Sequence, residues 1–273
     1  MSVTESDALL IRGGAPLRGD VRVGPDQAIL ETTLAVAALA RGSSQLHGVI
    51  ATPQLEVALA AWRQLGVRGQ LDDDRLSVES PGLDALSAPT GAIECGMSAR
   101  LLAQLSGVLC AQQFGTQLRA AANVRVDHWI EVLRARGAHI ASRSGIPAAG
   151  SGAARAAQRG ASPHGAVYDA VLGGEDSVRS LGEGPAHGGA VEAAPGGDAA
   201  LLYPPVSVAP LLASERLQAL DASLPFSDAV GKDAILLNAL FAAGPTVLSE
   251  PHVSSDHLER AFVEVGLPLR RIG

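Results

Sequence analysis

Residues 21–42 have the pattern of a strand, a tight turn and a helix, an arrangement that can hold an anionic ligand. The N-terminus of a helix carries a partial positive charge, and its free N–H groups point at whatever binds there. Sites of this kind usually add a lysine or an arginine. This turn offers Asp26, Gln27 and Ala28, followed by Glu31, and no basic residue. The segment therefore resembles an anion site that lacks its cation.

A second group of residues that could do chemistry lies near the C-terminus. Lys232 is the only lysine, and it could meet a bound anion or pair with Asp228 or Asp233 on the same helix turn. Asp256 and Glu259 fit the start of a helix, where carboxylates satisfy free N–H groups and the helix dipole. Neighbouring positions on a helix point in different directions, so we expect no metal site here.

The cysteines and the overall composition exclude several kinds of protein. Cys95 and Cys110 lack the spacing of a metal-binding pair and are expected to be buried, reduced thiols. The net charge is −7 and no basic run occurs, which argues against nucleic-acid binding. No apolar run reaches the roughly 18 residues that span a bilayer, and the first ten residues do not read as a signal peptide. We expect a soluble, cytoplasmic protein without a cofactor.

The elements that would position these residues recur three times along the chain. Each unit runs from a helix through a Gly-containing turn and a strand to a second helix and another Gly. The turn glycines Gly42 and Gly115 are 73 residues apart, and Gly115 and Gly244 are 129 apart. Without a 56-residue insertion the second interval would also be 73. We predict an α/β fold with internal pseudo-threefold symmetry, in which the second-helix tryptophans Trp62 and Trp129 lie in the core.

The insertion falls within residues 143–200, which are rich in Gly, Ala, Ser and Pro and poor in large apolar residues. Such a composition buries too little surface to offset the entropy of ordering. We predict a flexible segment with a short ordered piece near the residues VYDAVL. The remaining chain divides into repeats at about 20–85, 86–142 and 204–273, within one domain over 8–273.

Three stretches make the chain resemble the enolpyruvyl transferase family, in particular the 5-enolpyruvylshikimate-3-phosphate (EPSP) synthases. The opening stretch PLRGDVRVGPDQAILETTLAVAALARGSSQLHG follows the family's PGDKSxxxR turn and helix, and IECGMSARLLAQL follows its CGNSGTTMR helix. The stretch from Pro204 to Arg260, which contains Val230 and ends in SEPHVSSDHLER, follows the family's third unit. The resemblance implies one lobe of three βαβαββ units, an inside-out α/β barrel, with the helices gathered inside and four-stranded sheets around them.

The family's ligand-binding residues are mostly replaced in this sequence. The turn Lys and Ser, which the resemblance assigns to phosphoenolpyruvate and shikimate 3-phosphate, fall on Gln27 and Ala28, and the helix Arg falls on Thr32. Further replacements fall at Met97, Ala99, Arg100, Ala103, Val230 and Ser255, while Gly96, Ser98, Lys232, Asp256, His257 and Glu259 match the family. The RPM motif has no clean counterpart around Arg125. The family's ligand positions thus fall on Gln27, Ala28, Thr32, Ser98, Arg100, Arg125 and Lys232, and we expect no catalytic residue among them.

Three functional hypotheses follow. The first is a stand-alone lobe that does not transfer enolpyruvyl groups alone and acts as a binding, regulatory or structural protein. Its partner would be a second lobe or a second copy at the former inter-lobe face. The second is a divergent 3-phosphoshikimate 1-carboxyvinyltransferase of aromatic amino-acid biosynthesis, completed by a partner lobe. The third is the decaying product of a duplicated or truncated gene.

Overall fold

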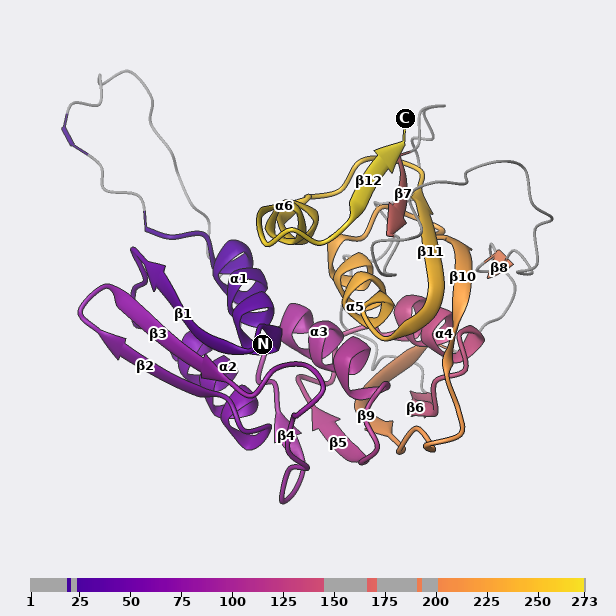
Figure 1. The fold of residues 1–273 in the computed structure, drawn as a ribbon, viewed down its shortest axis with the longest axis horizontal. Coiled ribbons are helices and arrows are strands. Elements are labelled where there is room, and N and C mark those ends of the chain that lie inside the picture. Colours follow the sequence, from indigo (N-terminus) through magenta and orange to yellow (C-terminus); the bar gives the residue numbers. More distant parts are fainter. Residues whose placement is uncertain (1–18, 21–23, 145–165, 171–190, 193–200, 273) are drawn as a thin grey trace, which may run out of the picture.

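The computed structural model describes residues 19–20, 24–144, 166–170, 191–192 and 201–272. Within these residues the chain forms six helices and twelve strands, and the strands make three separate sheets (Figure 1). The α/β class predicted from the sequence is confirmed. The predicted opening strand at 21–23 lies outside the described residues. No helix in the described part is long and apolar enough to cross a bilayer.

The first sheet is antiparallel and has the strand order β1-β3-β2, from β1 (Gly42–His47), β3 (Arg75–Ser80) and β2 (Arg68–Asp72). A tight hairpin joins β2 to β3, with Asp73 at φ 52°, a backbone region that short polar side chains tolerate. Helix α2 (Pro53–Gln64) begins at an N-cap Thr52 followed by proline, a strong local start signal. Its apolar stripe packs inward and buries Trp62.

The second sheet has the order β4-β5-β9-β6. Strands β4 (Ile93–Glu94) and β5 (Thr116–Arg119) are parallel, and β9 (Leu202–Val208) runs antiparallel to β5 and to β6 (Ile140–Ser144). Strand β9 opens the third predicted repeat, yet it completes the sheet of the second. Helix α4 (Asp127–Ala135) lies between β5 and β6 in the chain and buries Trp129, as predicted for both tryptophans.

The third sheet has the order β12-β7-β11-β10-β8. Strands β10 (Leu217–Ser223) and β11 (Ala242–Glu250) are parallel, and β7 (Ala166–Ala170) is antiparallel to β11 and to β12 (Leu269–Ile272). A short strand β8 (Val191–Glu192) pairs with β10. Two strands of this sheet therefore come from the predicted insertion, and β7 overlaps the piece for which order was predicted. Among the described residues the three sheets have three, four and five strands, whereas the resemblance implies four in each.

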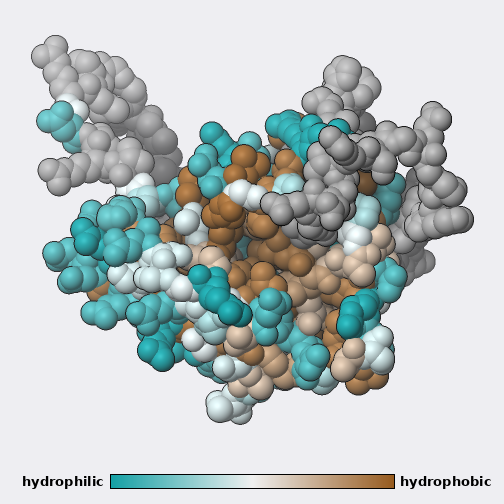
Figure 2. All heavy atoms as spheres, in the orientation of Figure 1, coloured by the Kyte–Doolittle hydropathy of each residue, from teal (hydrophilic) through white to brown (hydrophobic). Residues whose placement is uncertain are grey.

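Helices α1 (Gln27–Leu39), α3 (Ala99–Leu109) and α5 (Ala229–Ala239) lie among the sheets, and α6 (His257–Glu264) packs beside α1 (Figure 1). Small residues allow the close approach, because Ala35 and Ala38 on α1 are fully buried. A Cβ added at Gly107 on α3 would overlap the carbonyl oxygen of Ala234 on α5. In the same orientation, hydrophilic residues cover the first sheet and hydrophobic residues gather in the middle, around α5 and α6 (Figure 2).

Both cysteines are free and fully buried, as predicted. Burial raises the pKa of the Cys95 thiol to about 12, and burial also raises the pKa of Cys110. Neither thiol is therefore a nucleophile near neutral pH.

Candidate functional site

The N-termini of the three central helices are each closed by a capping side chain. The Asp26 carboxylate accepts a hydrogen bond at 3.0 Å from a backbone N–H in the first turn of α1, and the Ser98 hydroxyl does the same at 3.0 Å for α3. The Asp228 carboxylate accepts two such bonds, at 3.1 and 2.9 Å, at the start of α5. The caps use the N–H groups that an anion would need, and two of them are carboxylates that repel it.

These helix ends lie close together. A backbone hydrogen bond from Ile29 lowers the pKa of Asp26, and the nearby charges of His257 and Arg100 act in the same direction. The segments that lead into α5 and α6 are also joined, since the Ser227 hydroxyl donates to the carbonyl of His252 at 2.6 Å. One end of the helix bundle therefore brings together family positions from all three repeats.

The side chain of Gln27, at the family's turn position, is hydrogen-bonded to Glu31 of its own helix, and Glu31 in turn contacts the start of α3. The Gln27 side-chain amide donates to one oxygen of Glu31 at 2.9 Å, and the Ser98 hydroxyl donates to the other at 2.8 Å. Glu31 is only 6% exposed. An acid thus links the first and second family turns, whose counterparts in the family the resemblance assigns to anionic ligands.

The cation at the second family turn is neutralised across the helix bundle. Arg100 on α3 forms an ion pair with Asp233 on α5, and the Gln104 side-chain amide donates to the same carboxylate oxygen at 3.3 Å. Burial raises the pKa of Asp233 to about 6, although Arg100 and Gln104 act to lower it. The positive charge of Arg100 is therefore neutralised by the buried carboxylate of Asp233.

Lys232 is fully buried and lies between two glutamates. Its Nζ is 2.6 Å from Glu259 Oε1 and 3.3 Å from Glu250 Oε1. The predicted pairing with Asp228 or Asp233 on the same helix turn is wrong. Those carboxylates instead cap α5 and hold Arg100, while α6 and β11 supply the partners of Lys232.

The start of α6 differs in part from the sequence prediction. Asp256 occupies the N-cap position, but its side chain makes no capping hydrogen bond. Glu259 lies in the first turn, as predicted, yet its side chain turns inward to Lys232, and burial raises its pKa. Glu250 is held in place by Ser254, whose backbone N–H and hydroxyl donate to it at 2.9 and 2.7 Å. Among the described residues no group of three or more His, Cys, Asp or Glu side chains is arranged to hold a metal ion.

Arg125 lies apart from these residues at the start of α4. Its guanidinium donates to both carboxylate oxygens of Asp127, at 3.2 and 2.7 Å. The next residue, His128, pairs with Asp228. Although burial by itself raises the pKa of Asp228, His128 and two backbone N–H groups hold it below its ordinary value.

The remaining family positions carry no charge. Ala28 is half-buried in the first turn of α1, and Thr32 is 1% exposed, with a hydroxyl oxygen that has no hydrogen-bond partner. An arginine at position 32 would have to enter the helix core. In this chain position 32 is therefore part of the packed interior and does not face a ligand site.

Three contacting pairs, Glu31 with Ser98, Arg100 with Asp233, and Lys232 with Glu259, are together called the inner polar cluster. Each of its two cations is paired with at least one carboxylate, so the cluster stabilises contacts between helices and offers no unpaired positive charge to a ligand. Glu250, Gln104 and His128 were not predicted from the sequence. No local signal could have identified them, because the charged side chains that they contact lie 18 or more residues away in the chain.

The chain is similar in sequence to known proteins of one family. The family model for EPSP synthase (3-phosphoshikimate 1-carboxyvinyltransferase) matches residues 11–161. The 3-phosphoshikimate 1-carboxyvinyltransferase of Acidithiobacillus ferrooxidans is 27% identical over 268 residues, which cover 97% of this chain and 48% of the relative. That of Alkalilimnicola ehrlichii is 28% identical over 269 residues, with 96% and 47% covered. The chain thus spans about half the length of these relatives.

The solved structures agree on the fold. The EPSP synthase from Acinetobacter baumannii superposes with a TM-score of 0.65 at 22% identity, over 91% of this chain and 44% of that one. At this identity the likeness establishes the architecture alone. The mixed α/β arrangement described above is therefore similar to part of an EPSP synthase.

Proposed function

Since this chain belongs to the EPSP synthase family, we propose that it is a single lobe of that fold that does not transfer enolpyruvyl groups by itself. In this proposal the lobe consists of three βαβαββ units related by pseudo-threefold symmetry. Its activity is to bind another protein, in a regulatory or structural role. The proposal keeps the cytoplasmic location expected from the sequence.

The observation that supports this proposal is the pairing of every cation at the family ligand positions. Arg100 pairs with Asp233, Arg125 with Asp127, and Lys232 with two glutamates. A phosphate ester needs several charge-assisted hydrogen bonds, each worth roughly 1.5–3 kcal/mol. Taking Arg100 from buried Asp233 would itself cost about 3–5 kcal/mol, the usual penalty for an uncompensated buried charge. Binding of the family's anionic substrates is therefore opposed at the buried positions of Arg100 and Lys232.

A binding role is supported by the apolar side chains at the end where the central helices begin. Met97 is 83% exposed just before α3, Ile29 is 48% exposed in the first turn of α1, and Phe226 is 41% exposed just before α5. Exposed apolar side chains that lie together at one end of a fold are candidates for an interaction surface. The partner in this proposal is a second lobe on another chain, or a second copy of this chain.

The comparisons favour one alternative, a divergent 3-phosphoshikimate 1-carboxyvinyltransferase completed by a partner lobe. The relatives named for that activity align over 96–97% of this chain. Under this alternative the chain would join enolpyruvyl transfer from phosphoenolpyruvate to shikimate 3-phosphate, a step of the shikimate pathway. Closure with the partner would have to break the carboxylate pairs around Arg100 and Lys232.

One experiment separates the two. The purified 273-residue chain, alone and as the complex recovered by pull-down from native extract, is assayed for phosphate release from phosphoenolpyruvate with shikimate 3-phosphate. We expect no release in either case. Activity of the complex but not of the chain alone would establish the alternative, and activity of the chain alone would overturn both.

A further inference from the structure

The end of the helix bundle where the central helices begin carries most of the exposed large apolar side chains. Among the described residues eight such side chains are exposed, and five of them, which we call the apolar face, lie at this end: Ile29, Ile50, Met97, Phe226 and Val253. The other three lie in the loop before β10 and at the end of α6: Leu212, Val263 and Val265. The exposed apolar side chains are therefore concentrated on one side of the fold.

The topology brings the apolar face together from segments far apart in the chain. Strands β1 and β11 follow α1 and α5 and run back to the end where these helices begin, so Ile50 and Val253 come just after the strands. Ile50 lies beside the turn before α1, because a Cβ added at Gly24 would be 3.9 Å from its Cδ1. The hydrogen bond from the Ser227 hydroxyl to the carbonyl of His252 joins the segment after β11 to the start of α5.

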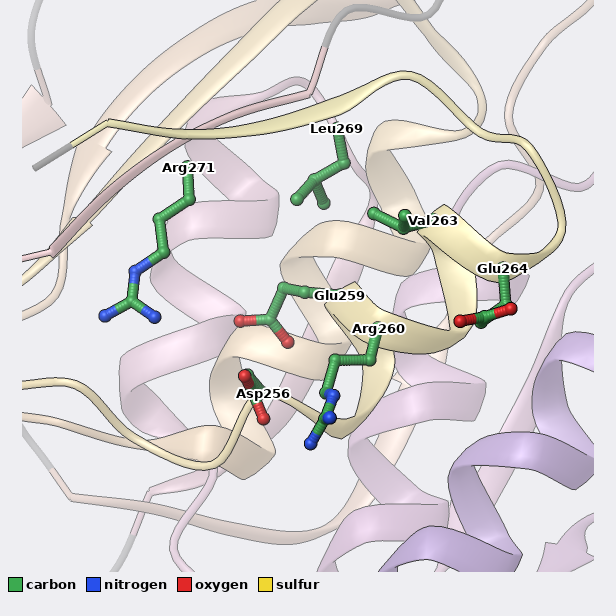
Figure 3. A pocket seen from close by; sticks show the side chains of 7 residues that line it. All are labelled: Asp256, Glu259, Arg260, Val263, Glu264, Leu269 and Arg271. Atoms are coloured by element: carbon green, nitrogen blue, oxygen red, sulfur yellow. The ribbon is translucent and has the colours of Figure 1, made fainter.

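Charges of opposite sign lie next to one another near the apolar face. Arg119 Nη1 and Glu94 Oε1 are 3.5 Å apart at the ends of β5 and β4, and Glu94 is three residues before Met97. Figure 3 shows the side chains of Asp256 and Arg260 near each other at the start of α6, where the Arg260 N–H donates to the Asp256 carbonyl at 3.0 Å. Each place therefore presents an acid and a base together.

A third pair of this kind lies beside Phe226. Arg125 Nη2 is 2.7 Å from Asp127 Oδ2, and the ring of the next residue, His128, packs 5.2 Å from that of Phe226. A guanidinium beside a carboxylate is self-complementary, because a copy turned about a two-fold axis can place its carboxylate against the guanidinium of the first. Exposed ion pairs add little affinity, so they select the partner while the apolar face supplies the driving force.

We propose that two copies of this chain bind each other through the apolar face, as a two-fold symmetric dimer. The inference rests on the proposed binding role and names the partner as a second copy. In the dimer the apolar side chains of the two copies cover one another, and the mixed charges form a polar rim, which is the usual anatomy of a protein interface. The starts of the three central helices are then covered by protein.

Sedimentation equilibrium of the full chain over a concentration series tests the dimer. We expect a monomer–dimer equilibrium with a Kd in the micromolar range. Met97→Glu and Val253→Glu should each raise this Kd by about tenfold or more, since the dimer would bury a carboxylate among apolar side chains. Leu212→Glu is the matched control, because Leu212 is also exposed but lies away from the apolar face, and its Kd should be unchanged. Melting curves verify that each variant is folded.

A chain that stays monomeric throughout the series would overturn the dimer. The assay of phosphate release would still decide the proposed function, so the two can fail separately. A dimer that Leu212→Glu weakens and the other two variants do not would refute the assignment of the interface.

Spin labels locate the interface independently. The native cysteines are free but fully buried, so a label attaches to the introduced thiol of Met97→Cys or Leu212→Cys. The distance between labels on the two copies should be shorter for position 97 than for position 212. The reverse order would contradict a dimer through the apolar face.

Discussion

The Nζ of Lys232 lies 2.6 Å from Oε1 of Glu259, and neither side chain has more than 5% of its surface exposed. The two residues come from α5 and α6, so their ion pair ties the third central helix to the helix that packs beside α1. Glu250 provides a second carboxylate for the same ammonium group. The family-matching lysine is therefore part of the framework of this fold.

Replacing this lysine should strongly destabilise the protein. Lys232→Met leaves Glu250 and Glu259 buried without their cation, and we expect a loss of about 3–5 kcal/mol in the free energy of unfolding. Urea denaturation measures the loss, with Arg63→Gln on the exposed face of α2 as a control that should change stability by less than about 0.5 kcal/mol. A Lys232→Met protein as stable as the parent would show that Lys232 contributes little to the framework.

The stability of the protein should depend on pH through Asp233. Its pKa in the folded state is about 6, above its ordinary value of 3.8, so the folded state binds the proton more tightly than the unfolded state does. Protonated Asp233 therefore stabilises the folded state. This stabilisation is fully present below about pH 4 and is lost as the pH rises to about 6. The free energy of unfolding of the parent should fall over this window by about 3 kcal/mol relative to Asp233→Asn. Parallel curves for the two proteins would contradict the assignment.

The contact between α3 and α5 should not tolerate a methyl group at Gly107. A Cβ at this position overlaps the Ala234 carbonyl, so Gly107→Ala should destabilise the protein by about 1–3 kcal/mol or more through overpacking. This loss should exceed the gain of roughly 1 kcal/mol in helix propensity. Gly91→Ala is the matched control, because nothing lies within 4 Å of its added Cβ. Thermal melts compare the two, and a more stable Gly107→Ala protein would disprove the tight contact.

Restoring the family turn should recover little binding. A millimolar mixture of phosphoenolpyruvate and shikimate 3-phosphate should not shift the melting curve of the parent. A protein that binds a ligand present at a hundredfold excess over Kd would gain about 2.7 kcal/mol in its free energy of unfolding. Gln27→Lys with Ala28→Ser should give at most a small shift, because Glu31 and the paired Arg100 remain.

Adding Thr32→Arg to that double variant should lower the melting temperature rather than improve binding. Thr32 is 1% exposed, and a guanidinium there is buried without a carboxylate partner. Stronger ligand-induced stabilisation in the triple variant than in the double variant would show that the turn before α1 accepts the family residues after all.

Local features of this protein were determined by the sequence alone. The N-caps Thr52 and Ser98 act within three residues, and the spacing that placed Trp62 and Trp129 in the core follows from the period of a helix. The α/β class and the family resemblance rest on the same local patterns, repeated along the chain.

Only the tertiary structure decided how the charges pair. Lys232 is adjacent to Asp233 in sequence, but neighbouring side chains on a helix diverge, so Lys232 turns to Glu259 and Asp233 to Arg100, 133 residues away. The same holds for β7, which lies in the predicted insertion and pairs between β11 and β12. A buried charge takes whichever partner the packing of helices brings within reach, and that packing is a property of the whole fold.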